Sequence, residues 1–195
     1  MTLRFEVLGK FFRNSHRRLA KLECPRVIND LRRRKIYRTL PRGIRSVLFV
    51  CKGNICRSPF AAVYCEAKLK EGGSHIKVRS AGLETTAGKE AHPLASIAAQ
   101  QHDLSLQAHV TTLLTRELVN QATLILVMEQ LHYATLLQLY PEAKGKVFRL
   151  GYFSSTLAID IVDPYDGTLK DFNACYRVIR QSCDHLLKYL GDMGQ

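Results

Sequence analysis

Short apolar runs alternate with amphipathic stretches from residue 46 to the end of the chain. Four of the runs are continuously apolar or rich in β-branched residues, which is typical of strands buried on both faces of a sheet. These runs span 46–51, 76–82, 122–129 and 146–151. The pattern therefore predicts four short strands, with the first ending at Cys51.

The stretches between and after these runs repeat apolar residues every three or four positions, which predicts helices. They span 59–72, 93–104, 115–122, 130–143 and 167–192. Strand alternating with helix predicts a doubly wound α/β fold, in which a four-stranded parallel sheet carries helices on both faces. Ligands of such sheets bind beyond the carboxyl ends of the strands, where the strand order reverses.

The length of the chain supports one core rather than two. It has 195 residues, 46% of them hydrophobic, which suits a single domain over 46–195 with an N-terminal appendage. No apolar run approaches the roughly 20 residues of a membrane-spanning helix, and the N-terminus lacks a signal-peptide pattern. Six scattered cysteines do not suggest a disulfide framework. We therefore expect a cytoplasmic protein with free thiols.

Charge divides the chain at the same boundary. Residues 1–45 hold 14 Lys or Arg against three acidic residues, a net charge of +11 out of +12 for the whole chain. The basic cluster at 32–35 could attract an anionic membrane surface or nucleic acid, although no aromatic-interleaved motif supports nucleic acid. The alternative is a solvated extension that folds against the body or stays mobile, or an over-long reading-frame start. All these interpretations of this basic N-terminal extension stay open.

The stretch CKGNICRSP, residues 51–59, follows the first predicted strand directly. Gly53 and Asn54 tolerate positive φ, which would turn backbone N–H groups inward, and Ser58-Pro59 suits the start of a helix. Inward amides and a helix N-terminus bind phosphate oxygens, and the guanidinium of Arg57 can hold two of them. The same positive field favours the thiolate form of a cysteine, so Cys51 is a candidate nucleophile.

A cysteine nucleophile needs a partner that protonates the leaving group. The segment VDPYDG at 162–167 offers Asp163, held in extended backbone by the following proline, and then the aromatic Tyr165. Together these residues predict phosphoryl transfer through a covalent phosphocysteine.

From residue 46 onward the chain resembles the low-molecular-weight protein tyrosine phosphatases, in particular the bacterial branch that acts with tyrosine autokinases in capsule and exopolysaccharide export. The matching segments, in the family's order, are VCKGNICRSP, SAGL, AGKEAHPLA, LSLQAHV, ILVMEQLH, PEAKGKVFRLG and DPYDG. The resemblance covers about three quarters of the chain and leaves residues 1–45 without a counterpart.

The resemblance implies a role for each site residue. Cys51 would be the nucleophile, Arg57 the clamp on the phosphate oxygens, and Asp163 the general acid and later the base. Ser80 and His109 would support the loop, Ser58 would donate to the thiolate, and Tyr165 would flank the phosphotyrosine ring. The remaining loop residues would line the phosphate site: Lys52, Gly53, Asn54, Ile55 and Cys56. Cys56 would also lie close enough to Cys51 for a reversible disulfide, and no metal or cofactor would be needed.

Two residues depart from the family pattern. Lys52 replaces the aliphatic residue usual after the nucleophile, and Asp166 replaces the second aromatic residue of eukaryotic relatives. The expected partner is a phosphotyrosine protein, such as a tyrosine autokinase. Two alternatives remain: an arsenate reductase on the same scaffold, which usually recruits two further cysteines that 66–174 lack, and a phosphotyrosine-binding protein without turnover.

Overall fold

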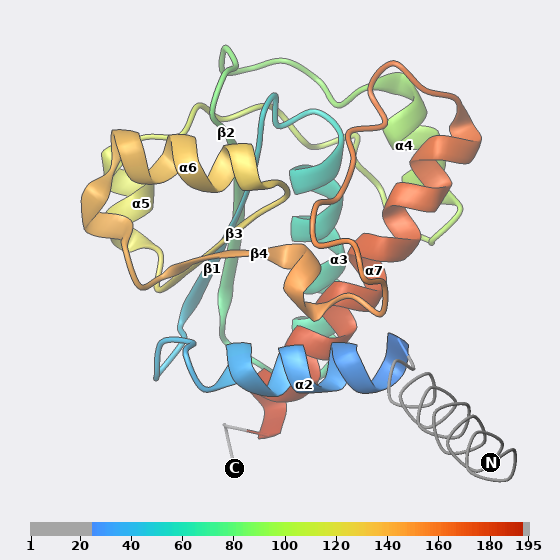
Figure 1. Cartoon of the computed structure of the whole chain (residues 1–195). Coiled ribbons are helices and arrows are strands. Elements are labelled where there is room, and N and C mark those ends of the chain that lie inside the picture. The colour runs from blue at the N-terminus through green and yellow to red at the C-terminus, as the bar shows by residue number, and fades with distance from the viewer. Residues whose placement is uncertain (1–24, 193–195) are drawn as a thin grey trace, which may run out of the picture.

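A parallel four-stranded sheet forms the centre of the computed structural model, which describes residues 25–192 (Figure 1). Its strands lie in the order β2-β1-β3-β4, so that β1 has a neighbour on each side. The strands are β1 (Ser46–Cys51), β2 (Lys77–Gly82), β3 (Leu124–Val127) and β4 (Val147–Arg149). The predicted doubly wound α/β fold is confirmed.

Helices cover both faces of this sheet, as the alternating pattern predicts. Figure 1 shows α3, α4 and α7 on one side and α5 and α6 on the other. The described helices are α2 (Pro25–Tyr37), α3 (Arg57–Glu71), α4 (Pro93–Gln100), α5 (Arg116–Gln121), α6 (Gln130–Leu139) and α7 (Leu169–Asp192). Two short 3₁₀ helices, η1 (Pro141–Ala143) and η2 (Leu150–Phe153), flank β4. None of the described helices has the length and apolar character needed to cross a bilayer.

The side chains of alternate residues in the central strands pack into two separate cores. In β1, Val47 and Phe49 pack with α3 and α7 residues in one cluster, while Leu48 and Val50 belong to the other, under α5 and α6. This alternation follows from the two-residue period of a strand, and it explains why SVLFVC is apolar throughout. Burial on both faces fixes the register of β1 and therefore the position of the loop that follows Cys51.

Helix α2 lies across the end of the sheet where β1 begins and packs against η2 (Figure 1). Its Tyr37 ring stacks on Tyr189 of α7, with centroids 4.2 Å apart, and Leu40 after the helix is buried in the larger core. Residues 25–45 therefore share a core with the body. The domain boundary at residue 45 stays a prediction, and residues 1–24 of the extension lie outside the described residues.

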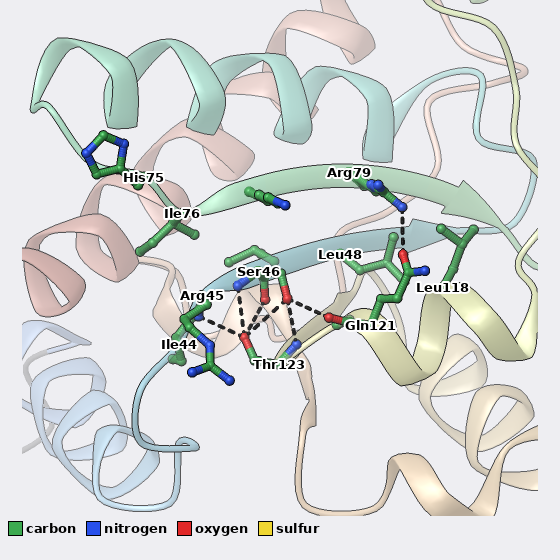
Figure 2. A pocket seen from close by; sticks show the side chains of 13 residues that line it. Ile44, Arg45, Ser46, Leu48, His75, Ile76, Arg79, Leu118, Gln121 and Thr123 are labelled. Atoms are coloured by element: carbon green, nitrogen blue, oxygen red, sulfur yellow. Dashed lines mark hydrogen bonds between the residues drawn. The ribbon is translucent and has the colours of Figure 1, made fainter.

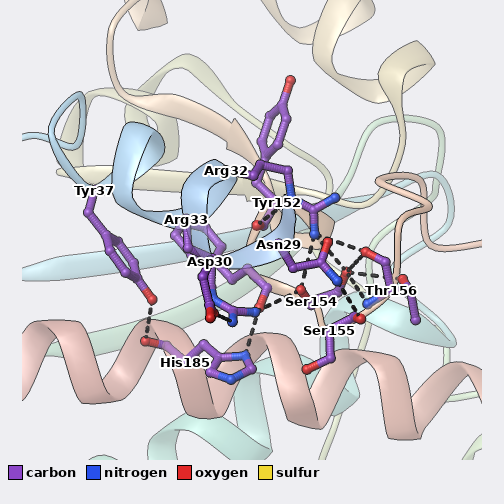
Figure 3. Close-up of polar contacts among 11 residues, drawn as sticks. Asn29, Asp30, Arg32, Arg33, Tyr37, Tyr152, Ser154, Ser155, Thr156 and His185 are labelled. Carbon is purple, nitrogen blue, oxygen red and sulfur yellow. Dashed lines mark hydrogen bonds and ion pairs between the residues drawn. The ribbon is translucent and has the colours of Figure 1, made fainter. Parts of the chain in front are cut away.

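Two arginines of α2 bind the loop that follows η2 (Figure 3). The guanidinium of Arg32 donates to four backbone carbonyls at 2.9–3.3 Å, those of Tyr152, Ser154, Thr156 and Leu157. Arg33 donates to the Ser154 carbonyl at 3.0 Å, and the Asn29 amide donates to the Ser155 carbonyl at 2.6 Å. Half of the basic cluster at 32–35 is thus engaged inside the molecule, whereas Arg34 and Lys35 are exposed.

We expect Arg32→Ala to lower the free energy of unfolding by about 1–3 kcal/mol, because hydrogen bonds from a charged donor are lost together. The same change at exposed Arg34 removes no described contact, so its effect should stay within about 0.5 kcal/mol. Urea unfolding of both variants measures the difference. Equal stability of the two variants would show that Arg32 does not fasten α2.

Candidate active site

The loop that follows β1 lies at the switch point of the sheet. β1 pairs with β2 on one side and with β3 on the other, so its carboxyl end opens into the crevice where α/β folds bind ligands. Cys51 is the last residue of the strand, and α3 begins at Arg57 with Cys56 as its N-cap. Ser58 lies one residue inside α3, close to the predicted helix start.

Asn54 holds this loop in shape through its backbone and its side chain. Its φ of 55° is left-handed, which asparagine tolerates better than most residues. The side-chain amide donates to Ser58 Oγ at 2.8 Å and to Ser80 Oγ at 2.9 Å, and its oxygen accepts from the Thr112 amide at 2.9 Å. These hydrogen bonds fix the shape of the loop, and the contact with Ser80 fits the supporting role that the resemblance implies for that residue.

His109 braces the same turn from outside the loop. Its Nε2 lies 2.7 Å from the Asn54 carbonyl oxygen, so this nitrogen donates the hydrogen bond. Burial lowers the pKa of His109, which favours a neutral ring with a single N–H. The contact is structural, as the resemblance implies.

Gly53 does not adopt the positive φ that its type suggested, so that expectation is wrong for this residue. Asn54 alone supplies the left-handed turn of the loop. The tight glycine is Gly82 at the end of β2, where a Cβ atom would lie 2.9 Å from the Lys52 carbonyl oxygen. The backbone of the loop can therefore lie directly against β2.

The Cys51 sulfur receives two polar contacts from the loop. The backbone amide of Asn54 donates to Sγ at 3.3 Å, and Ser58 Oγ lies 3.1 Å from Sγ. Because Ser58 Oγ already accepts from Asn54, its own hydrogen can go to the sulfur or to the Ala81 carbonyl oxygen, which lies farther away at 3.4 Å. Both contacts favour a negative charge on Sγ, which is what a nucleophilic thiolate requires.

Arg57 is 1% exposed, and its guanidinium gathers two acidic side chains. Nη1 donates to Glu129 and to the Ile161 carbonyl oxygen at 2.8 Å, and Nη2 donates to Asp163 Oδ2 at 2.5 Å. Burial lowers the pKa of Arg57, but the negative charges of Cys51, Glu129 and Asp163 outweigh it, so the pKa rises above its ordinary value. The guanidinium is therefore a fixed cation.

The Arg57 guanidinium has N–H hydrogen-bond donors that are not engaged by the described residues. Nε of Arg57 is buried and has no hydrogen-bond partner among the described residues. The guanidinium carries five N–H donors, and only three of them are engaged. These free N–H donors can bind an oxyanion.

Asp163 stands on a loop that is fastened on both sides. The Ile161 amide donates to the Met128 carbonyl at the end of β3, and the Gly167 amide donates to the Pro164 carbonyl. The Asp163 side chain is 37% exposed, so it faces both Arg57 and solvent. The structure thus brings Cys51 and Arg57, from one loop, together with Asp163, which lies 106 residues after Arg57 in the chain.

A pocket of about 300 Å³ opens above Cys51. Ile55 and Tyr165 supply apolar walls, and Asp163 also lines it. Tyr165 is 50% exposed and lies edge-on to His92, with centroids 5.4 Å apart. The pocket therefore has room beside the sulfur for a flat group flanked by Tyr165.

Lys52 and Cys56 occupy the outer and inner edges of the loop. Lys52 Nζ lies 3.6 Å from Glu84 Oε2, and both side chains are well exposed, so this pair adds little stability. Cys56 is buried and is a free thiol, as are the other four described cysteines. Burial raises the pKa of Cys56, which keeps it protonated. A disulfide between Cys51 and Cys56 stays a prediction, and peptide mapping after peroxide treatment tests it.

Glu129 is a site residue that the sequence patterns did not single out. It follows β3, is 28% exposed on its side chain, and pairs with Arg57. His132 lies behind it, with Nε2 3.9 Å from Glu129 Oε1, and burial lowers the His132 pKa. The available signal was an acidic residue directly after a buried parallel strand. Among residues 25–192 no group of His, Cys, Asp and Glu is arranged to hold a metal ion.

Comparison with known proteins gives the same picture. Residues 46–195 match the family model described as low molecular weight phosphotyrosine protein phosphatase. The chain is 39% identical over 137 residues to the low molecular weight protein-tyrosine-phosphatase Wzb of Escherichia coli K12. The aligned region covers 70% of this chain and 89% of Wzb. It is 35% identical over 146 residues to a protein-arginine-phosphatase of Geobacillus stearothermophilus, covering 75% and 93%.

A solved structure agrees with the fold. The tyrosine phosphatase AmsI of Erwinia amylovora superimposes with a TM-score of 0.69 at 35% identity, over 75% of this chain and 95% of AmsI. With the geometry around Cys51 and Arg57, these matches establish that the chain belongs to the low-molecular-weight phosphotyrosine protein phosphatase family.

Proposed function

We propose that the protein hydrolyses phosphotyrosine in proteins through a phosphocysteine intermediate. The observation that carries this proposal is the Arg57 guanidinium, buried beside Cys51 with unused N–H donors. Phosphoryl transfer demands little covalent chemistry of a protein beyond position and charge. The fixed positive charge of Arg57, buried beside the Cys51 sulfur, positions the phosphate and stabilises its negative charge.

In the first step, the Cys51 thiolate attacks phosphorus, the S–P bond forms and the bond between phosphorus and the tyrosine oxygen breaks. Phosphate oxygens bind the free donors of Arg57 and the inward amides of the loop. An oxygen placed on Nη2 competes with Asp163 for this nitrogen, which releases the Asp163 carboxyl toward the leaving oxygen. The released carboxylate takes up a proton from solvent and then donates it to that oxygen.

In the second step, the Asp163 carboxylate accepts a proton from water as the water attacks phosphorus. The S–P bond breaks, inorganic phosphate forms, and Cys51 leaves as a thiolate. The hydroxyl of Ser58 stabilises the negative charge on sulfur at the start and at the end of the cycle. No oxidant or metal takes part in either step.

The walls of the pocket favour an aromatic substrate. Ile55 and Tyr165 can enclose a phenyl ring, which favours phosphotyrosine. Glu84 and Asp166 also line the pocket, and their carboxylates could pair with a guanidinium. Phosphoarginine is therefore the second candidate, in keeping with the protein-arginine-phosphatase relative. Faster turnover of phosphoarginine than of an aryl phosphate would favour that candidate.

The expected targets are a bacterial tyrosine autokinase or its substrates in exopolysaccharide or capsule production, in the cytoplasm. The similarity to Wzb and AmsI supports this proposal. Arsenate reduction is not favoured, because 66–174 lack the two further cysteines that it usually recruits. Binding without turnover is not favoured, because the nucleophile, the clamp and the acid are all present in one site. Nucleic acid is not an expected partner.

Contact with an anionic membrane is a further part of the proposal. Arg34 and Lys35 of α2 and Arg38 just after it are exposed, and Leu31 of α2 is 61% exposed. Such a surface attracts anionic lipid by charge and apolar contact. We expect the variant Arg34→Gln/Lys35→Gln/Arg38→Gln to sediment less with phosphatidylserine vesicles than the wild type does. If changing Lys68, Lys70 and Lys144 to Gln reduces sedimentation equally, binding depends on total charge and not on the surface around Leu31.

We expect Cys51→Ser to abolish hydrolysis of p-nitrophenyl phosphate while leaving the fold intact. Asp163→Asn should lower kcat roughly 10²–10⁴-fold for substrates with poor leaving groups, and less for p-nitrophenolate, since general acid catalysis contributes that much. Steady-state rates over a series of aryl phosphates give the dependence on leaving-group pKa. Retained activity in Cys51→Ser, or an unchanged dependence in Asp163→Asn, would contradict the mechanism.

Glu129→Gln keeps the shape of the side chain but removes its charge from Arg57. We expect kcat/KM to fall roughly 10–100-fold, because a loss of about 1–3 kcal/mol at a charged hydrogen bond translates into that factor. The matched control is Glu142→Gln, which removes a carboxylate from the exposed pair with Arg116. If both variants retain wild-type kcat/KM, Glu129 does not position the clamp.

A further inference from the structure

A second recess lies at the opposite end of the sheet from Cys51 (Figure 2). Its volume is about 630 Å³, roughly twice that of the pocket at the nucleophile and within the range of small-molecule sites. The first residues of β1 and β2 lie on one side, and the end of α5 lies on the other. Nothing in the proposed reaction uses this recess.

The recess exists because α5 is too short to cover the whole face of the sheet. Residues 48, 50 and 81 of this face belong to the smaller core, which α5 and α6 cover. Ser46 pairs in register with Lys77 and Leu48 with Arg79, so all four side chains point to the same face. At Lys77 and Arg79 no described helix covers this face, and both side chains are exposed.

The polar groups in the floor satisfy one another. Thr123 Oγ1 accepts from the Ser46 amide at 2.9 Å and from the Arg45 amide at 3.0 Å. Ser46 Oγ donates to the Gln121 carbonyl oxygen at 2.8 Å (Figure 2). The apolar part of the lining comes from Ile44, Leu48, Ile76 and Leu118.

The rim of the recess is cationic. Arg45, Lys77 and Arg79 line it together with His75, and all four side chains are exposed. No Asp or Glu lines it, and none of these cations takes part in an ion pair among residues 25–192. Arg79 donates one hydrogen bond to Gln121 Oε1 at 2.9 Å, which orients its guanidinium along the recess (Figure 2).

We propose that this recess binds a small free anion that carries a phosphate or carboxylate group on a flat apolar body. The apolar body covers the floor, and the anionic group pairs with Lys77 and Arg79 at the rim. Charge complementarity does not favour residues 1–24 as the occupant, because they carry six Lys or Arg against two acidic residues. The inference does not depend on the catalytic mechanism.

Three probes titrated into the full-length ¹⁵N-labelled protein test this site by amide chemical shifts. They are 2-naphthoate, the neutral isostere 2-naphthamide, and inorganic phosphate. We expect 2-naphthoate to shift the amides of 45–48, 76–79 and 121–123. Naphthamide should bind about tenfold more weakly, since two or three exposed ion pairs of up to about 1 kcal/mol are lost. Inorganic phosphate should not shift these amides, because it has no apolar body.

The variant Lys77→Gln/Arg79→Gln should weaken 2-naphthoate binding about tenfold for the same reason, with unchanged turnover of p-nitrophenyl phosphate. Lys70→Gln/Lys144→Gln removes the same charge elsewhere on the exposed surface and should bind like the wild type.

Several results would overturn the proposal. They are equal affinity for naphthoate and naphthamide, shifts confined to the loop 51–58, and wild-type affinity in Lys77→Gln/Arg79→Gln. Binding of anionic vesicles that depends on Lys77 and Arg79, without binding of free naphthoate, would assign the surface to a membrane instead.

Discussion

The rest of the site depends on the ion pairs and hydrogen bonds of the buried Arg57 guanidinium. A guanidinium with 1% exposure is stable only if charges and acceptors surround it, and here they come from three places in the fold. Glu129 follows β3, Ile161 and Asp163 stand on the loop before α7, and Cys51 ends β1. Two of these partners, Cys51 and Asp163, are also the proposed nucleophile and acid, so folding and the proposed reaction require the same geometry.

The two ends of the sheet do different work. At the carboxyl ends of the strands, the loop after β1 directs the Asn54 backbone amide toward the Cys51 sulfur, and the charge of Arg57 interacts with Cys51. At the amino ends, α2 lies across the molecule and Arg32 holds the loop 152–157, which leads to Asp163 six residues later. The family match begins at residue 46, so α2 adds a brace from outside the matched region. The recess beside Arg45 and Lys77 belongs to this second end.

The sequence predicted much of this arrangement because local rules determine it. Runs such as SVLFVC are apolar on both faces, and only a covered parallel strand accommodates them. The loop 51–59 could be interpreted because its residues interact with near neighbours in sequence: Asn54 with Ser58, and Ser58 with Cys51. Gly53 was misjudged because glycine permits positive φ without requiring it, and Asn54 supplied the turn instead.

What the sequence did not predict depends on contacts between distant segments. Glu129 is 72 residues from Arg57, and no local pattern shows that the two side chains meet. Arg32 and Arg34 look equivalent in the run RRRK, yet only the helical phase and the position of the loop 152–157 decide which one is engaged. The recess could not be predicted either, since it depends on where α5 ends relative to β1 and β2.

The central claim is that Cys51 accepts the phosphoryl group while Arg57 holds its oxygens. The most direct measurement is rapid acid quench of Asp163→Asn during turnover of a ³²P-labelled phosphotyrosine peptide, followed by digestion and mass spectrometry. The account predicts one labelled peptide, with phosphate on the sulfur of Cys51. Turnover with no label on Cys51, or label on another residue, would contradict it.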